Sequence, residues 1–426
     1  MDCHGRHVRV RFGHDLLPCK YASASQSSRS AAKEPKVKLV REGTWDQALE
    51  IASQSFSRLD SQTVTLPDAI DRFLAQDALS LCDLPAFETS SMDGWAVSGE
   101  GPWKLMGEVA TGRASTQVIH YGQSLAIATG GVIPQGTTSV IPWEKATEKD
   151  GEISGEIEEG ANIRPAGMES KTGDVLVSAG ARITPPMAGL FAATGHDSIE
   201  VINKPRVAIF FLGDELIHSG VPVDGAIRDA LGPQLPAVLE SMGATISSTQ
   251  FVKDDLDVLN AEIAKVLGLV DLIITTGGTA DGPRDYVKPV LNNLGAKMLI
   301  DCVKVRPGYH VLLAGISQSD RDIAFLALPG NPQSALAALY SFGKPLIKSF
   351  LGASQEKLAE IELSSSLTTP EGFSRLVPGT CSGKIFTPTA YLGSAMLRGV
   401  AHAQGFALIN PGVNPEGSNA RWIPFN

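Results

Sequence analysis

The amino-acid sequence predicts a multidomain α/β protein whose largest part is a three-layer domain, a parallel β-sheet covered by helices on both faces. Strand-like and helix-like patterns alternate from residue 205 to about residue 351, which is typical of such a domain. Short alternating strands interrupted by glycine and proline fill residues 100–160 and 355–426, which indicates two small β-rich modules. At 426 residues, the chain has room for two to four domains of about 100–200 residues each.

The composition is that of an ordinary soluble globular protein. Hydrophobic residues make up 43% and charged residues 19% of the chain, which allows large buried cores. The formal net charge of −10 argues against a general nucleic-acid binder and a membrane-surface binder. No stretch approaches the ~20 apolar residues of a membrane span, and the N-terminus has no apolar signal-peptide core. The five scattered cysteines lack metal-ligand spacing, as expected in a reducing cytoplasm.

We expect five parts along the chain. The ranges are a flexible leader (1–36), an N-terminal mixed α/β linker domain in two segments (37–84 and 161–203), a β-rich insert domain (85–160), the α/β sheet domain (204–352) and a C-terminal small β-barrel-like domain (353–426). Hydrophobic periodicity in the linker domain predicts a strand and three helices. The strand is expected at residues 61–66, and the helices at residues 45–56, 66–79 and 185–194.

In the sheet domain, four strand-like runs alternate with four helical patterns. The run at residues 270–276 is apolar and β-branched, of the kind buried on both faces. The strands are expected at residues 207–212, 244–251, 270–276 and 323–328, and the helices at residues 231–242 and 256–267, from Pro283 onward, and at residues 332–349. The helix that begins near Pro283 is expected to bury one face. That face carries Tyr286, Val287, Val290, Leu291 and Leu294.

The stretch VDLIITTGGTADGPRDYVK, residues 270–288, has the strongest chemical signal. A buried strand runs into Gly277 and Gly278, and a helix with Pro283 in its first turn follows. Free backbone N–H groups and the helix dipole at such a turn form an anion site. The turn lacks the Gly-Lys-Ser/Thr end of a Walker loop and offers Asp281 and Asp285, and carboxylates repel phosphate unless a hard cation such as Mg²⁺ lies between them. A turn shaped only by packing remains an alternative.

Polar segments also follow the other predicted strands. Ligands of open α/β sheets bind beyond the carboxyl ends of the strands, so convergence of these segments indicates a site. The segments are Gly213-Asp214-Glu215, Asp254–Asp255 and Pro329-Gly330-Asn331-Pro332. Arg306 supplies a cation near this edge, and Arg375 and Ser394 are further polar candidates. The alternative is that glycine and proline only shape loops and that the acids, Asp254 above all, cap helices.

Taken in order, the segments MDGWAV, ATGGVIPQG, NIRPAG, GDEL, DDLDVL, TTGG followed by DY, VRPG and LPGNPQSA resemble those of the molybdopterin molybdenumtransferases, the MoeA family, which includes the E domain of gephyrin. The resemblance spans about residues 37–426. It implies cytoplasmic, four-domain homodimers that insert molybdate into adenylylated molybdopterin with Mg²⁺ and release AMP in molybdenum cofactor biosynthesis. It also implies a cleft between the sheet domain of one subunit and the N-terminal domains of the other. The protein partners that the resemblance implies are molybdopterin adenylyltransferase and molybdoenzymes, whereas nucleic acid and membranes are not expected.

The resemblance also implies roles for individual residues. The catalytic residues would be Asp93, Glu215, Asp254 and Asp285, with the last three as magnesium ligands. The substrate-binding residues would be Thr129, Asp214, Gly277, Gly278, Thr279, Arg306, Pro329, Gly330, Asn331, Pro332, Ser334 and Arg375. These residue types suit the chemistry, because molybdate and pyrophosphate are anions that a carboxylate ring can hold only through a bridging cation.

The chain departs from the family pattern in several of these loops. Where the family usually has KPGKP, residues 306–310 read RPGYH, and Cys302 takes a position at which some members have another lysine. Leu231 replaces an asparagine and Ala280 a serine. Each lost charged hydrogen bond costs roughly 1.5–3 kcal/mol, so two alternatives remain: a catalytically impaired paralogue that serves as a dimeric scaffold, and nucleotidyl transfer onto molybdopterin. The retained acidic residues favour the molybdenumtransferase.

Overall fold

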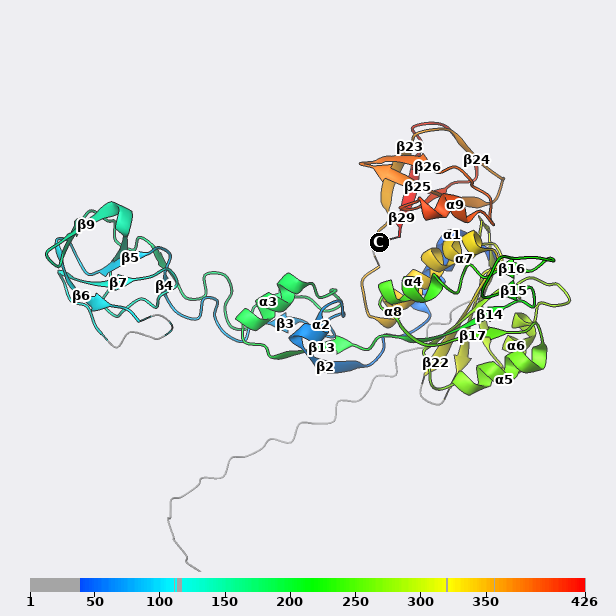
Figure 1. Cartoon of the computed structure of the whole chain (residues 1–426), viewed down its shortest axis with the longest axis horizontal. Helices are drawn as coiled ribbons and strands as arrows, with labels where there is room; N and C mark the ends of the chain where they lie inside the picture. The colour runs from blue at the N-terminus through cyan, green and yellow to red at the C-terminus, as the bar shows by residue number, and fades with distance from the viewer. Residues whose placement is uncertain (1–38, 111, 113–116, 319–320, 356, 426) are drawn as a thin grey trace, which may run out of the picture. The chain divides into compact units, whose positions relative to one another are not determined.

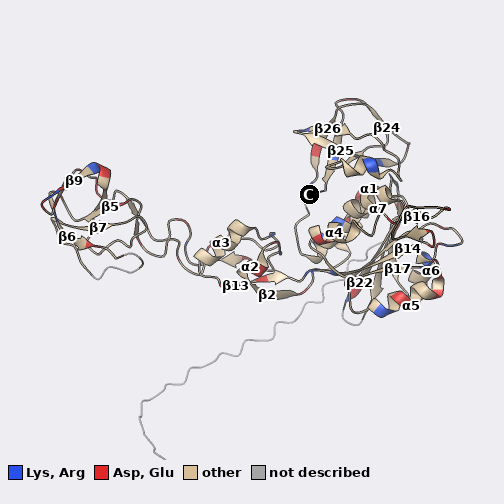
Figure 2. Cartoon of the chain, viewed as in Figure 1, with Lys and Arg blue, Asp and Glu red and all other residues tan. Residues whose placement is uncertain are grey.

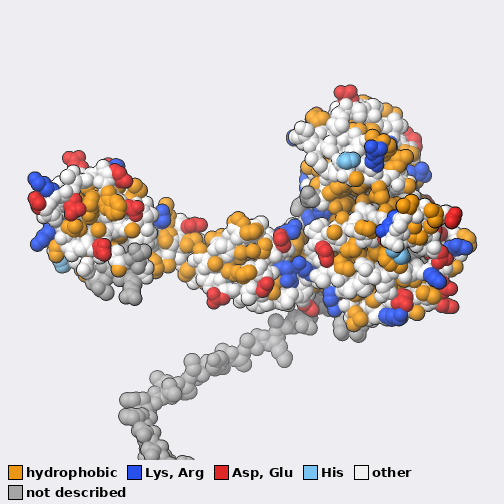
Figure 3. All heavy atoms as spheres, in the orientation of Figure 1, with side chains coloured by type: hydrophobic (Ala, Val, Ile, Leu, Met, Phe, Trp, Pro, Cys, Tyr) orange, Lys and Arg blue, Asp and Glu red, His pale blue; other side chains and the backbone are white. Residues whose placement is uncertain are grey.

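The computed structural model describes residues 39–425 except residues 111, 113–116, 319–320 and 356 (Figure 1). The leader that we predicted at residues 1–36 lies outside the described residues. None of the described helices is long and apolar enough to cross a membrane. Figure 3 shows charged side chains of both signs mixed over the visible face, and α5 (Leu256–Val266) carries both acidic and basic side chains (Figure 2).

A seven-stranded sheet forms the largest part of the fold. Its strands, in spatial order, are β1 (Val40–Gly43), β19 (Lys297–Val303), β21 (Leu312–Ser317), β22 (Asp322–Leu328), β18 (Leu272–Thr276), β14 (Arg206–Leu212) and β17 (Thr245–Val252). The last four are the predicted strands, and they pair in parallel as expected. We did not predict β21, which is antiparallel to both of its neighbours.

Helices cover both faces of this sheet. Along β14, Val207, Ile209 and Phe211 point into one core, and Ala208, Phe210 and Leu212 point into the other, the period of two that a strand imposes. The second core is closed by α5 and α6 (Val287–Asn293). The first is closed by α1 (Trp45–Gln54), α4 (Leu235–Ser241), α7 (Pro332–Ala338), η2 (Leu339–Gly343) and α8 (Lys344–Phe350). β1 and α1 thus contribute to the sheet domain, although we assigned their residues to the linker; the domain boundaries stay predictions.

Apart from the helix expected near Pro283, three predicted helices differ from the observed ones for local reasons. The helix predicted at residues 332–349 is divided into α7, the π-helical turn η2 and α8, because Pro345 has no N–H to donate to the preceding turn. The helix predicted at residues 66–79 is wrong beyond α2 (Leu66–Ala69), since Asp71 adopts a positive φ of 64° and donates its N–H to Ile183. α4 begins at Leu235 instead of residue 231.

The remaining modules are small and mainly β-structured. In the linker, α2 and α3 (Pro185–Ala193) pack on the pair β2 (Ser61–Thr65) and β13 (Ser198–Ile202). The insert is a six-stranded sheet of β8 (Ser139–Pro142), β5 (Gly94–Val97), β7 (Gln123–Ile127), β6 (Trp103–Glu108), β10 (Glu152–Gly155) and β9 (Ala146–Lys149). The C-terminal strands are β25 (Ser374–Ser382), β26 (Ile385–Pro388), β23 (Ala359–Leu363), β29 (Asn419–Pro424) and β27 (Gly405–Ile409). Because β27 pairs back with β25, these five strands close the barrel that we predicted.

Candidate active site

Two adjoining cavities lie at the carboxyl ends of the parallel strands. The larger has a volume of about 680 Å³, and the smaller has a volume of about 280 Å³. His310, Pro329 and Asn331 line both of them. The segments after β14, β17, β18 and β22 all contribute to the larger cavity, so the polar segments singled out in the sequence do converge.

The predicted site residues fall into three groups. The larger cavity is lined by Glu215, Asp254, Gly277, Gly278, Thr279, Asp285, Pro329, Gly330, Asn331 and Pro332. The smaller cavity is lined by Arg306, Pro329, Asn331, Ser334 and Arg375, together with Ser394. Asp214 reaches the site through Asp254, whereas Asp93 and Thr129 line neither cavity.

The acidic wall of the larger cavity is built around Asp254. Its backbone N–H donates to Asp214 Oδ1 at 3.3 Å, and Asp214 N–H donates to Asp254 Oδ2 at 3.4 Å. Burial raises the pKa of Asp254, and the negative charges of Asp214 and Glu215 raise it further. The capping interpretation of Asp254 is wrong, because Asp255 is the N-cap of α5 and accepts the N–H of Val258 at 2.9 Å. Asp254 therefore does not cap α5, and it lines the cavity.

The glycine turn has the expected backbone but not the expected helix. Gly277 and Gly278 have φ values of +84° and +64°, which favour glycine. The N–H of Gly277 donates to Leu328 O at 2.9 Å, so this group is not free for a phosphate as we expected. α6 begins at Val287, not near Pro283, and buries Val287, Val290 and Leu291 as predicted. Any anion cradle here is made by the loop and not by a helix N-terminus.

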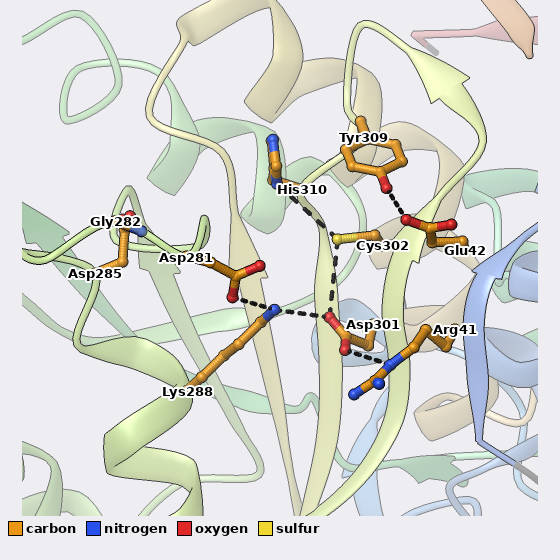
Figure 4. A network of polar contacts seen from close by, with 10 residues as sticks. All are labelled: Arg41, Glu42, Asp281, Gly282, Asp285, Lys288, Asp301, Cys302, Tyr309 and His310. Carbon is orange, nitrogen blue, oxygen red and sulfur yellow. Dashed lines mark hydrogen bonds and ion pairs between the residues drawn. The ribbon is translucent and has the colours of Figure 1, made fainter.

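Hydrogen bonds and ion pairs hold the loop between the glycines and α6 (Figure 4). Asp285 Oδ2 accepts the N–H of Gly282 at 2.7 Å. This hydrogen bond closes a turn, so α6 begins only after it, at Val287. Lys288 Nζ lies 2.9 Å from Asp281 Oδ1 and 3.1 Å from Oδ1 of the buried Asp301. These contacts tie the loop to β19 and fix the backbone that carries Asp285.

The smaller cavity is cationic. β20 (Val305–Arg306) pairs in parallel with β25, so Arg306 lies directly opposite Arg375. The Arg306 guanidinium stacks on the Phe373 ring at 4.7 Å, and Arg375 Nη1 donates to Thr368 O at 3.2 Å. Like charges opposite one another in a sheet are destabilising, and arginine binds tetrahedral oxyanions through its fork of N–H donors. This cavity therefore suits an anion.

Asp93 and Thr129 meet each other in the β-rich insert. The N–H and the hydroxyl of Thr129 donate to Asp93 Oδ1 at 2.6 Å and 3.0 Å. The hydrogen bond from the Thr129 N–H, followed by that from its hydroxyl, lowers the pKa of Asp93. Two residues that were predicted separately thus contact each other, and Thr129 stabilises the ionised Asp93 carboxylate.

Sequence reasoning missed several charged residues of the larger cavity, namely Arg228, Asp229, Arg284 and His310. Arg284 lies between Pro283 and Asp285, so the charge of this loop was a usable signal. Asp229 is partly structural, since its Oδ1 accepts the N–H groups of Leu231 and Gly232, both at 2.9 Å. This turn explains why α4 begins late.

A magnesium ion would need substrate oxygens as well as these carboxylates. Among the residues that the structure describes, no group of three or more His, Cys, Asp and Glu side chains is arranged to hold a metal ion. Mg²⁺ is commonly bound by only one or two carboxylates together with substrate phosphates. Asp254, whose pKa is raised by burial and by neighbouring acids, fits that arrangement.

Comparisons with known proteins agree with this geometry. The family described as MoeA N-terminal region (domain I and II) matches residues 43–195, and the family described as a probable molybdopterin binding domain matches residues 208–349. A molybdopterin molybdenumtransferase of Staphylococcus aureus (strain COL) is 28% identical over 385 residues, which are 86% of this chain and 91% of the relative. The enzyme of Bacillus subtilis (strain 168) is 29% identical over 391 residues, 86% and 90% of the two chains.

Solved structures share the fold. Two molybdopterin biosynthesis MoeA proteins from Pyrococcus horikoshii superpose with TM-scores of 0.76 and 0.75 at 24% and 20% identity. The alignments cover 91% and 90% of this chain and 100% and 99% of those chains. With both family matches in the expected order, relatives along most of its length and this fold, the chain belongs to the MoeA family.

Proposed function

We propose that this protein is a molybdopterin molybdenumtransferase, which inserts molybdate into adenylylated molybdopterin and releases AMP in molybdenum cofactor biosynthesis. One observation carries the proposal: a cavity with two opposed arginines, Arg306 and Arg375, adjoins a larger cavity lined by Glu215, Asp254 and Asp285. The relatives that carry this name cover 86% of the chain. A pure scaffold has no physical use for this arrangement, so the scaffold alternative is not favoured.

The two cavities divide the substrates between them. The smaller cavity would hold molybdate between Arg306 and Arg375, with the side chains of Ser334 and Asn331 as further hydrogen-bond partners. The larger cavity would hold the pterin and the pyrophosphate link, against the loop that starts at Gly277. Because the cavities share a wall, molybdate and the adenylylated substrate would be held next to each other, which lowers the entropic cost of their reaction.

Glu215, Asp254 and Asp285 would hold the Mg²⁺ that we propose as cofactor, and the ion would offset negative charge on the departing AMP. Three features of the chain prepare these side chains for that role. Asp254 is held by the backbone of Asp214, and Asp285 by the N–H of Gly282. The ion pairs of Lys288 anchor the same loop to the sheet. Carboxylates held in place need little reorganisation when substrate arrives.

We further propose a cytoplasmic homodimer in which Asp93 and Thr129 of one subunit complete the larger cavity of the other. The support is that these two residues form an ordered, ionised pair in a separate module and line neither cavity. Light scattering should give a mass near twice the chain mass of 44.9 kDa. A monomer that releases AMP at the full rate would contradict this arrangement. Molybdopterin adenylyltransferase and molybdoenzymes are the protein partners that the substrate and product would require.

The test is to titrate the full chain with adenylylated molybdopterin and Mg²⁺, add molybdate and quantify AMP. We expect stoichiometric AMP only when molybdate and Mg²⁺ are both present, and Asp285→Ala should abolish it. ATP consumption without AMP release from the preformed adenylate would instead indicate nucleotidyl transfer. A folded protein that binds the adenylate but releases no AMP on molybdate addition would overturn the proposal.

A further inference from the structure

His310 occupies the junction of the two cavities. Its ring lines both of them, together with Pro329 and Asn331. Its Nδ1 lies 3.9 Å from Cys302 Sγ, and Figure 4 shows the other ring nitrogen, Nε2, pointing away from Cys302. One nitrogen is therefore engaged at the sheet, and the other is available to whatever lies between the cavities.

The surroundings of His310 hold the ring in place without competing for the ligand. Burial, followed by the charge of Asp301, raises the pKa of the Cys302 thiol to about 11, so this neighbour is neutral. The Tyr309 ring lies edge-on to the imidazole with centroids 4.8 Å apart. Tyr309 itself donates its hydroxyl to Glu42, a hydrogen bond that raises its pKa to about 12. Neither neighbour offers a positive charge to an anion.

The two positions at which the MoeA pattern can have lysine are thus occupied by neutral side chains in this protein. Cys302 and Tyr309 both turn toward the network of Figure 4. The fixed cations of the smaller cavity are Arg306 and Arg375. An oxyanion seated there would lie beside His310, whose imidazole lines the same cavity and can add a charged donor.

The titratable and charged groups around His310 come from every wall. In the smaller cavity these groups are Arg306, Arg375 and Tyr309. In the larger cavity they are Glu215, Arg228, Asp229, Asp254, Arg284 and Asp285. On the side of the ring that faces the sheet they are Asp281, Asp301 and Cys302. Asp281 and Asp301 are already bridged by Lys288. Within the smaller cavity, the fixed charges beside the ring are those of Arg306 and Arg375, which an anion would neutralise.

We propose that His310 is a substrate-binding residue that donates a hydrogen bond from Nε2 of its imidazolium form to a tetrahedral oxyanion at the junction of the cavities. This inference rests on the proposed function. The oxyanion is either molybdate or a phosphate of the adenylylated substrate, which present the same acceptor chemistry. Histidine changes charge between about pH 5 and 8, so this contact would make anion binding pH-dependent, which a lysine would not.

The experiment compares the wild type with His310→Ala and His310→Lys by calorimetric titration with molybdate alone and, separately, with AMP. His120→Ala is the matched control, because His120 is exposed in the insert and lines neither cavity. Loss of a charged hydrogen bond weakens binding by about 10- to 100-fold, which is the effect expected for His310→Ala at pH 6. His310→Lys should restore the affinity and remove the weakening of molybdate binding that we expect for the wild type between pH 6 and 8.

The two arms separate the sources of the oxyanion. An effect confined to molybdate assigns the contact to molybdate, and an effect confined to AMP assigns it to phosphate; both support the proposal. Unchanged affinity of a folded His310→Ala in both arms would overturn it, as would the same pH slope in wild type and His310→Lys. A wild type that binds neither anion and releases no AMP would overturn the proposed function too, whereas an active wild type with an unaffected His310→Ala overturns this inference alone.

Discussion

The two edges of the seven-stranded sheet place carboxylates in opposite environments, one buried and one half-buried. At the amino edge, the Asp271 side chain is 3% exposed, and its Oδ2 accepts from Arg206 N and Nε at 2.8 Å and 3.2 Å. Arg321 makes a second ion pair with Asp271. At the carboxyl edge, Asp254 is flanked by Asp214 and Glu215, and its pKa is raised. One acid is neutralised by the fold, and the other is left with like charges.

Whether a carboxylate is paired with cations distinguishes a structural acid from a functional one. A paired buried carboxylate stabilises the fold, because removing either partner leaves an uncompensated charge. Unpaired acids that repel one another cost free energy, so their persistence at a cavity indicates a ligand that completes them. On this basis, Asp271 is structural and Asp254 functional, and substitution of each should have the opposite consequence.

The largest effect is expected for Asp254→Asn. Removing this carboxylate should slow AMP release by about 100-fold or more, since charge stabilisation at a reacting phosphate is worth several kcal/mol. The unfolding midpoint should not fall, because the substitution relieves repulsion. Initial rates of AMP release and urea unfolding would be measured together. The control is Asp257→Asn, an exposed acid in the first turn of α5; equal activity of the two variants would remove Asp254 from the site.

A smaller effect, on stability instead of activity, is expected for Asp271→Asn. This substitution should lower the free energy of unfolding by about 1–2 kcal/mol, the lower part of the range for a lost buried charge partner, because the two arginine side chains are 43% and 40% exposed and screened by water. AMP release per folded molecule should remain that of the wild type. Urea titration and the AMP assay would be run on the same samples. Lost activity at unchanged stability would refute the structural role.

Much of the fold could be predicted from the sequence because β14, β18 and β22 are apolar and buried, and because strand-like and helix-like patterns alternate along the chain. β14, β17, β18 and β22 are found where predicted, and their carboxyl ends do meet. β21 was missed although it is apolar, since nothing local shows that a strand runs antiparallel. The start of α6 was misplaced because the turn held by Asp285 Oδ2 and Gly282 N–H depends on side-chain geometry, which helical periodicity does not report.

The site was predicted less completely, because its missing parts arise from tertiary pairing. Arg306 lies opposite Arg375 only because β20 joins β25 across nearly seventy residues of chain. His310 was noted only as a departure from the MoeA pattern, and its place on both cavity walls follows from how that loop leaves β20. The local sequence also does not show which of Asp254 and Asp255 caps α5, because either acid could accept the N–H groups of the first turn.

The smallest effect is the pH dependence of stability, which should differ in sign between Asp254 and Asp93. The pKa of Asp254 is raised in the folded protein, so its ionisation costs stability at neutral pH, and Asp254→Asn should be more stable than the wild type there. That gain should shrink as the pH falls through the raised pKa and vanish near the unfolded value of about 4.

The pKa of Asp93 is lowered by Thr129, so Asp93→Asn should lose stability above the unfolded value, and this loss should disappear as the pH falls through the lowered pKa. Urea midpoints of both variants between pH 3 and 7, with a chelator present, would measure the two slopes. If the stability differences of the two variants from the wild type changed with pH in the same direction, the pKa values of Asp254 and Asp93 would not be shifted in opposite directions.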